Sequence, residues 1–190
     1  VMFDRIEAGT YLVAAAVTEG NLKIRNVIPK IIQTEINTLK KIGAKLIIKK
    51  NEIHIIGNKK IMSTNIVTAP YPGFPSDLAA QMMVLLCKAN KKSYIKEKIF
   101  ENRMMHVNEL QRMGAKILVK GNKAIIEGNT VFKSAEVMAT DLRASASLVL
   151  AALCAKGGKS YITRIYHLRR GYQELEKKLR KVGARIRRIN

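Results

Sequence analysis

The sequence predicts a mixed α/β domain made of three repeated helix-and-strand units that share a core of apolar helices. One phrase occurs three times, as LKKIGAKLIIKK at 39–50, LQRMGAKILVKG at 110–121 and LRKVGARIRRIN at 179–190. Its glycines, Gly43, Gly114 and Gly183, are 71 and 69 residues apart, and so regular a period indicates tandem structural units. The chain has 190 residues, 47% of them hydrophobic, which suits the core of one domain.

Three apolar segments predict the helices of that core, at residues 10–18, 78–89 and 142–155. Each is apolar or small on every side, which is typical of helices that are buried all round. We therefore expect them to pack on one another. The second and third open with residues that can accept hydrogen bonds from a free first turn, and the N-cap candidates are Ser76 or Asp77 and Thr140 or Asp141.

Short strands and amphipathic helices fill the rest of each unit. Strands are expected after the apolar helices, at 22–24, 93–95 and 160–162, and before two of them, at 65–68 and 135–139. Amphipathic helices are expected within 29–43, 104–114 and 170–183, each closed by the glycine of the phrase, which tolerates the positive φ found just past a helix end. Hairpins then turn at residues 50–51 and 121–122.

The repeat is incomplete at both ends of the chain. Only residues 1–7 precede the first apolar helix, where the other units have a full strand, and the third unit stops after one strand. The sequence also begins with valine. We therefore expect one domain over residues 1–190, with units at about 1–59, 60–130 and 131–190, to be part of a longer polypeptide.

Composition narrows the class of protein. The 35 Lys and Arg against 14 Asp and Glu give a net charge of +21, but the lysines are spread along the chain and aromatic residues are only 5%, which disfavours a nucleic-acid interface. Cys87 and Cys154 lie far apart in apolar runs, as small buried hydrophobes do, and no spacing suggests a metal site. No signal peptide or membrane span is evident, so we expect a cytoplasmic protein. We also expect no cofactor.

Charged residues gather at the predicted entrances of the helices. Asp77 follows a proline-rich stretch, Arg103 lies where a strand gives way to a helix, and Arg143 lies in the first turn of an apolar helix, where an unpaired guanidinium is costly. Arg170 follows in a predicted turn. One carboxylate and three arginines suggest a site for a small, highly charged anion. The alternatives are that Asp77 is only an N-cap, that Arg143 pairs only with Asp141, and that Arg170 is simply exposed.

Four stretches carry a resemblance to a known family: TAPYPGFPSD, IFENRMMHVNELQRMGA, VMATDLRASASLVLAAL and RIYHLRRGY. They closely resemble the C-terminal half of the bacterial UDP-N-acetylglucosamine enolpyruvyl transferases (UDP-N-acetylglucosamine 1-carboxyvinyltransferases), and the likeness covers essentially the whole chain. The resemblance implies the enolpyruvyl transferase fold, an inside-out α/β domain of three βαβαββ-type units with helices within and sheets outside. It also implies a second domain, missing here, that carries a reactive cysteine on a loop.

The family transfers the enolpyruvyl group of phosphoenolpyruvate to the 3-hydroxyl of UDP-N-acetylglucosamine, the first committed step of peptidoglycan synthesis. By resemblance, Asp77 contacts the sugar hydroxyl and is the candidate catalytic base, and the Ile99 backbone contacts the uridine nucleotide. Arg103 and Arg143 are expected near the carboxylate of phosphoenolpyruvate, and Arg170 near its phosphate. These residue types suit an addition and elimination that needs a base and fixed cations.

The sequence departs from the family pattern in two respects. Cys87 and Cys154 lie in core helices, so the reactive cysteine has no counterpart, and without the other domain we expect this chain alone to be inactive. Arg169 stands where the family usually has aspartate, beside Arg170. His54, His106 and His167 receive no catalytic role. Two alternatives stay open: a basic nucleic-acid-binding module, since RNA 3′-terminal phosphate cyclases share the general fold, and a catalytically dead relic of the transferase.

Overall fold

The computed structural model describes residues 2–189 as a mixed α/β structure. Six α-helices and nine strands alternate through that range, together with three short 3-10 helices (η). The helices are α1 (Arg5–Val17), η1 (Pro29–Ile32), α2 (Gln33–Lys41), η2 (Ser76–Leu78), α3 (Ala79–Cys87), α4 (Val107–Arg112), α5 (Leu142–Leu153), η3 (Ile165–Arg170) and α6 (Leu175–Lys181). The strands are β1 (Asn21–Arg25), β2 (Lys45–Lys49), β3 (Glu52–Ile56), β4 (Ile66–Val67), β5 (Ser93–Lys96), β6 (Ile117–Lys120), β7 (Lys123–Ile126), β8 (Glu136–Met138) and β9 (Tyr161–Thr163).

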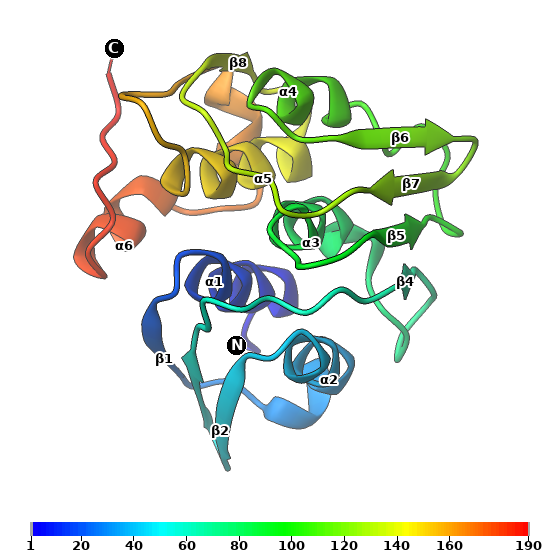
Figure 1. Ribbon diagram of the computed structural model, residues 1–190. Coiled ribbons are helices and arrows are strands. Elements are labelled where there is room, and N and C mark those ends of the chain that lie inside the picture. The colour runs from blue at the N-terminus through cyan, green and yellow to red at the C-terminus, as the bar shows by residue number, and fades with distance from the viewer. Residues whose placement is uncertain (1, 190) are drawn as a thin grey trace.

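The apolar helices α1, α3 and α5 form the centre of the molecule (Figure 1). Each of them contacts the other two, and every residue of α3 is buried. Helices that are apolar on all sides are stable only in such a position, because any exposed face would leave apolar surface in water. The predicted packing of the three helices on one another is confirmed.

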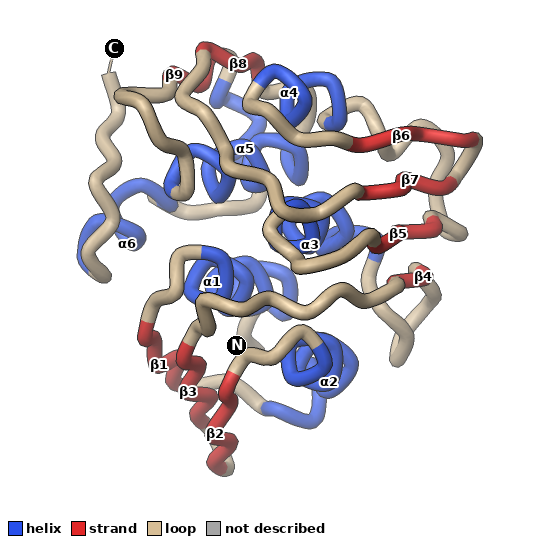
Figure 2. The backbone as a smooth tube through the Cα atoms, in the orientation of Figure 1, coloured by secondary structure: helices blue, strands red, loops and turns tan. Residues whose placement is uncertain are grey.

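The sheets lie outside this helical core (Figure 2). One sheet has the antiparallel order β1-β3-β2, and a second has the order β4-β5-β7-β6, in which only β4 and β5 run parallel. The third has the parallel pair β8-β9. Alternate residues of the middle strands point inward, so that Ile53 and Ile55 of β3 and Ala124 and Ile126 of β7 are buried. Helices inside and sheets outside confirm the predicted fold class.

At each of the three occurrences of the repeated phrase a helix ends just before the glycine, and after Gly43 and Gly114 a strand follows, as predicted. Gly43, Gly114 and Gly183 have φ values of +101°, +96° and +99°, a region that residues with a Cβ rarely adopt. In each joint the residue after the glycine donates its N–H to a carbonyl in the last turn, from Ala44 to Leu39 and at the equivalent positions of the other two, always at 3.0 Å. The orphan carbonyls of all three helices are therefore capped in the same way.

Two expectations about the starts of helices were wrong. The first apolar helix begins at Arg5 and not at residue 10, and Asp4 caps it by accepting from the N–H groups of Ile6 and Glu7. No strand lies in residues 2–7. Asp141 caps α5 as expected, but neither Ser76 nor Asp77 caps α3, because residues 76–78 form a 3-10 turn whose side chains bind elsewhere.

The predicted strand after Gly183 is also absent from the described residues. Residues 184–189 have no strand assignment, because a strand needs a ladder partner and β8 and β9 do not pair with this segment. Within residues 2–189, no helix is both long and apolar enough to cross a membrane.

Candidate active site

Asp77 lies between two arginines that come from different parts of the chain. Arg103 Nη2 is 3.1 Å from Asp77 Oδ1, and Arg143 Nη2 is 2.9 Å from Asp77 Oδ2. The Arg143 side chain is 16% exposed, whereas the Arg103 and Asp77 side chains are 29% and 34% exposed. The structure therefore brings together three of the predicted site residues at a partly open position.

Arg143 is the most buried member of this cluster, and its environment explains why it is charged there. Burial acts to lower the pKa of Arg143, but the hydrogen bond with Asp77 and the neighbouring Tyr172 outweigh this effect and raise the pKa. The guanidinium lies 5.8 Å from the centre of the Tyr172 ring. Asp141 accepts from the backbone N–H of Arg143 and caps α5. The alternative that Arg143 pairs only with Asp141 is therefore wrong.

One polar atom of Arg143 is left without a partner. Its Nη1 is buried and makes no hydrogen bond within residues 2–189. An unsatisfied buried donor on a charged group is costly, and a ligand that accepts a hydrogen bond removes the cost. Beside it lies a hollow of about 10 Å³, lined by residues that include Ser76, Arg103 and His106. This volume holds about one water molecule, so a substrate must lie over the cluster rather than inside it.

Ile99 and Arg170 form no hydrogen bond or salt bridge with this cluster among the described residues. Ile99 follows β5, is 37% exposed, and its N–H is bound by the carboxylate of Glu97 at 2.7 Å. Arg170 ends η3 and is exposed. The next residue, Gly171, lies so close to Leu142 that an added Cβ would come within 2.7 Å of that side chain. Arg170 is therefore held beside the end of α5 that carries Arg143.

The proline-rich loop that leads to Asp77 is held by residues of the first third of the chain. Arg5 donates from Nε to Glu35 at 2.6 Å and from Nη2 to the carbonyl of Gly73 at 3.1 Å, and its guanidinium lies 5.0 Å from the centre of the Tyr71 ring. Thr34 Oγ1 donates to the carbonyl of Pro72 at 2.6 Å. These contacts fix the loop before it enters the turn at Asp77.

Sequence reasoning missed a buried polar cluster beneath Arg143. Thr10 of α1, Gln81 of α3 and Tyr172 are each at most 1% exposed. The Thr10 hydroxyl lies 2.8 Å from the Tyr172 hydroxyl, and Gln81 Nε2 donates to both of these oxygens, at 3.2 and 3.1 Å. The cluster joins α1 and α3 to the segment after η3. A polar residue at an inward position of an otherwise apolar helix was the available signal.

His106 and Cys87 are buried and Cys154 is half-buried, and the pKa values of all three leave them uncharged at pH 7. Burial lowers the pKa of His106 to about 4, so its imidazole is neutral at pH 7. Burial also raises the pKa of Cys87 to about 12 and that of Cys154 to about 11. A thiol becomes a good nucleophile only as thiolate, so neither cysteine is suited to covalent chemistry.

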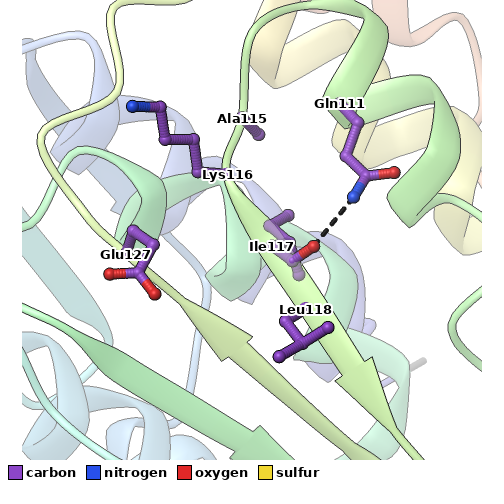
Figure 3. Close-up of a pocket in the computed structure, with 6 residues that line it drawn as sticks. All are labelled: Gln111, Ala115, Lys116, Ile117, Leu118 and Glu127. Atoms are coloured by element: carbon purple, nitrogen blue, oxygen red, sulfur yellow. Dashed lines mark hydrogen bonds between the residues drawn. The ribbon is translucent and has the colours of Figure 1, made fainter.

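A larger hollow of about 380 Å³ lies elsewhere, between α4, β6 and the end of β7 (Figure 3). Gln111 Nε2 donates to the Ile117 carbonyl at 2.8 Å along its wall, and Lys116 and Glu127 are its charged members. None of the predicted site residues lines it. The charged cluster at Asp77 is therefore the better candidate for the active site.

Fold and cluster together define a domain of the enolpyruvyl transferase class. The crystal structure of the enolpyruvyl transferase NikO from Streptomyces tendae superposes with a TM-score of 0.88 at 28% identity, covering 98% of this chain and 44% of that one. EPSP synthase from Acinetobacter baumannii shares the fold, with a TM-score of 0.80 at 20% identity over the whole chain and 48% of its own. Residues 1–179 match the EPSP synthase (3-phosphoshikimate 1-carboxyvinyltransferase) family, and the chain belongs to that family.

Within the family, curated relatives named UDP-N-acetylglucosamine 1-carboxyvinyltransferase match the full chain. The protein of that name from Pelagibacter ubique is 72% identical over 190 residues, and the one from Geotalea daltonii is 51% identical over 189. The resemblance drawn from the sequence is thereby confirmed. The chain spans about 45% of the length of each of these relatives.

Proposed function

We propose that the intact polypeptide containing this chain transfers the enolpyruvyl group of phosphoenolpyruvate to the 3-hydroxyl of UDP-N-acetylglucosamine. The observation that carries the proposal is Asp77 held between Arg103 and Arg143, in a chain 72% identical to a protein of that name. The product would be the first committed intermediate of peptidoglycan, made in the cytoplasm for the cell wall that cell shape and division require. The 190 residues form one domain of three units and supply about half of the site, and the other domain supplies the rest.

Each of the predicted site residues has a role in this reaction. Asp77 accepts the proton of the sugar 3-hydroxyl while the hydroxyl oxygen bonds to C2 of phosphoenolpyruvate. In the same step C3 gains a proton from a general acid. A C3 proton then returns to the conjugate base of that general acid while the bond between C2 and the phosphate oxygen breaks, which yields the enolpyruvyl ether and phosphate. Arg103 and Arg143 hold the carboxylate of phosphoenolpyruvate, and Arg170 holds its phosphate. The Ile99 backbone contacts the uridine nucleotide.

The two ion pairs of Asp77 suggest that it exchanges partners when substrate binds. Both of its oxygens are bound by guanidinium groups that phosphoenolpyruvate would need. When the substrate carboxylate binds the guanidinium groups of Arg103 and Arg143, Asp77 is released toward the sugar hydroxyl. The arginines would therefore keep the base in place until the anionic substrate arrives.

The acceptor can be tested directly, because the family also includes 3-phosphoshikimate 1-carboxyvinyltransferases. Purified intact polypeptide is supplied with phosphoenolpyruvate and either UDP-N-acetylglucosamine or shikimate 3-phosphate, and phosphate release is followed. We expect release only with the nucleotide sugar. Release with shikimate 3-phosphate alone would overturn the proposal, and release with neither would favour the catalytically dead relic.

A further inference from the structure

Glu97, directly after β5, is a buried carboxylate that accepts four hydrogen bonds. It is 2% exposed. Its Oε1 accepts from the Thr68 hydroxyl at 2.8 Å and from the backbone N–H groups of Ile99 and Phe100 at 2.7 and 3.2 Å. Its Oε2 accepts from the Ser76 hydroxyl at 2.7 Å. Within the described part of the chain no Lys, Arg or His forms a salt bridge with it, so hydrogen bonds alone hold this charge.

These four donors belong to the two loops that carry the candidate site. Thr68 and Ser76 stand at the two ends of the proline-rich loop, and Ser76 is the residue before Asp77. Ile99 and Phe100 open the turn that leads to Arg103, whose guanidinium lies 4.6 Å from the centre of the Phe100 ring. Because Arg103 in turn binds Asp77, the contacts form a closed ring that passes through the Glu97 carboxylate.

A carboxylate suits the centre of this ring, because all four groups donate to it and two of them are backbone N–H groups that can only donate. Burial acts to raise the pKa of Glu97, but the hydrogen bonds from Ser76, Ile99, Thr68 and Phe100 outweigh burial and lower the pKa. An amide of the same shape is neutral, so the hydrogen bonds that its oxygen accepts are weaker than those to a carboxylate. Its N–H₂ group also cannot accept from Ser76, whose hydroxyl would have to turn and accept instead, so both loops would be held less firmly.

We propose that Glu97 is a positioning residue that sets the sugar-nucleotide side of the site, by fixing the Ser76–Asp77 turn and the Ile99 turn relative to one another. The inference rests on the proposed function. It also restricts the contact at Ile99: since Glu97 takes the N–H of Ile99, the carbonyl oxygen is the backbone atom that this turn offers to the nucleotide. Of the three arginines assigned to phosphoenolpyruvate, only Arg103 belongs to this ring, and Arg143 and Arg170 lie on other segments, so the phosphoenolpyruvate side depends less on Glu97.

The test compares Glu97→Gln with Glu101→Gln in the intact polypeptide. Glu101 is an exposed glutamate four residues further along the same segment and provides a matched control. Affinity for UDP-N-acetylglucosamine is measured by calorimetry without phosphoenolpyruvate, and kcat and both KM values are measured by phosphate release. We expect Glu97→Gln to bind the nucleotide sugar about tenfold or more weakly and to lose kcat, while the KM of phosphoenolpyruvate changes less than about threefold.

A second variant guards against a folding failure. Ser76→Ala removes one donor from the ring and leaves the carboxylate and its other three hydrogen bonds, so it should shift nucleotide affinity in the same direction by about threefold. If Glu97→Gln and Glu101→Gln have the same kinetics, the inference about Glu97 is overturned and the proposed function is not affected. Equal loss for both substrates with a lowered Tm would overturn it in favour of general stabilisation. A wild-type protein that binds no UDP-N-acetylglucosamine would overturn the proposed function, and the inference with it.

Discussion

Replacing Asp77 by asparagine in the intact polypeptide separates a catalytic carboxylate from a structural one. The amide keeps the shape of the side chain but cannot take a proton from the sugar hydroxyl. We expect kcat to fall by about 10² or more, because general-base catalysis contributes on that order. Affinity for UDP-N-acetylglucosamine should change much less, since the amide can still form a hydrogen bond with the hydroxyl.

The same substitution has a second effect that follows from the two ion pairs. A hydrogen bond to a charged group contributes about 1.5–3 kcal/mol, and solvent reduces this to about 1 kcal/mol for Asp77, whose side chain is 34% exposed. Phosphoenolpyruvate must displace Asp77 from Arg103 and Arg143, and the neutral amide competes less. The KM of phosphoenolpyruvate should therefore stay the same or fall, by up to about fivefold.

Arg143→Ala should act in the opposite direction and provides the comparison. It removes a cation that the substrate carboxylate needs, so kcat/KM for phosphoenolpyruvate should fall. The loss should correspond to an increase of about 2–4 kcal/mol in activation free energy. Steady-state phosphate release with each substrate varied in turn measures all of these quantities. A fully active Asp77→Asn enzyme, or one whose KM for phosphoenolpyruvate rises tenfold, would refute the partner-exchange reasoning.

Three further outcomes are expected. Residues 1–190 alone should release no phosphate from the two substrates, because the site is assembled between two domains; turnover by this purified chain would contradict the half-site account. Tyr172→Phe should lower the free energy of unfolding by about 1–3 kcal/mol in urea titrations, because Thr10 and Gln81 lose a buried partner, and an unchanged midpoint would count against the cluster. His106, packed near Asp141 and Arg103, has a folded pKa of about 4, below its ordinary value of about 6.5. The unfolded chain therefore binds the proton first, so stability is full above about pH 6.5 and falls toward pH 4, by up to about 1.4 kcal/mol per pH unit, a slope that His106→Asn should reduce.

The repeat made much of the fold predictable from the sequence. The periodic glycines, the apolar segments and the turns at residues 50–51 and 121–122 are local signals, and the structure confirms the helices, joints and hairpins that they predicted. The ends were less predictable. Asp4 caps α1 in the same way as Asp141 caps α5, but the charges of Arg5 and Glu7 concealed the start of an otherwise apolar helix. Residues 184–189 carry a strand pattern but find no neighbouring strand among the described residues.

The site was predictable as a set of residues but not as a set of contacts. The guanidinium of Arg143 in the first turn of an apolar helix indicated an anionic partner. The sequence did not show that this partner is Asp77, because the two residues are 66 positions apart. Asp77 followed the pattern of an N-cap, but the 3-10 turn at Ser76–Leu78 turns its carboxylate toward the arginines. Nothing in the sequence pointed to Glu97, because only the folded loops bring its four donors together.

The most direct test of the central claim is a crystal structure of the intact polypeptide with UDP-N-acetylglucosamine bound, read at Asp77. If this chain supplies the base, the 3-hydroxyl of the sugar lies within about 2.6–3.2 Å of an Asp77 carboxylate oxygen, and the nucleotide contacts the backbone carbonyl of Ile99. A nucleotide sugar bound with its 3-hydroxyl out of reach of Asp77, while both arginine pairs stay closed on that carboxylate, would contradict the account.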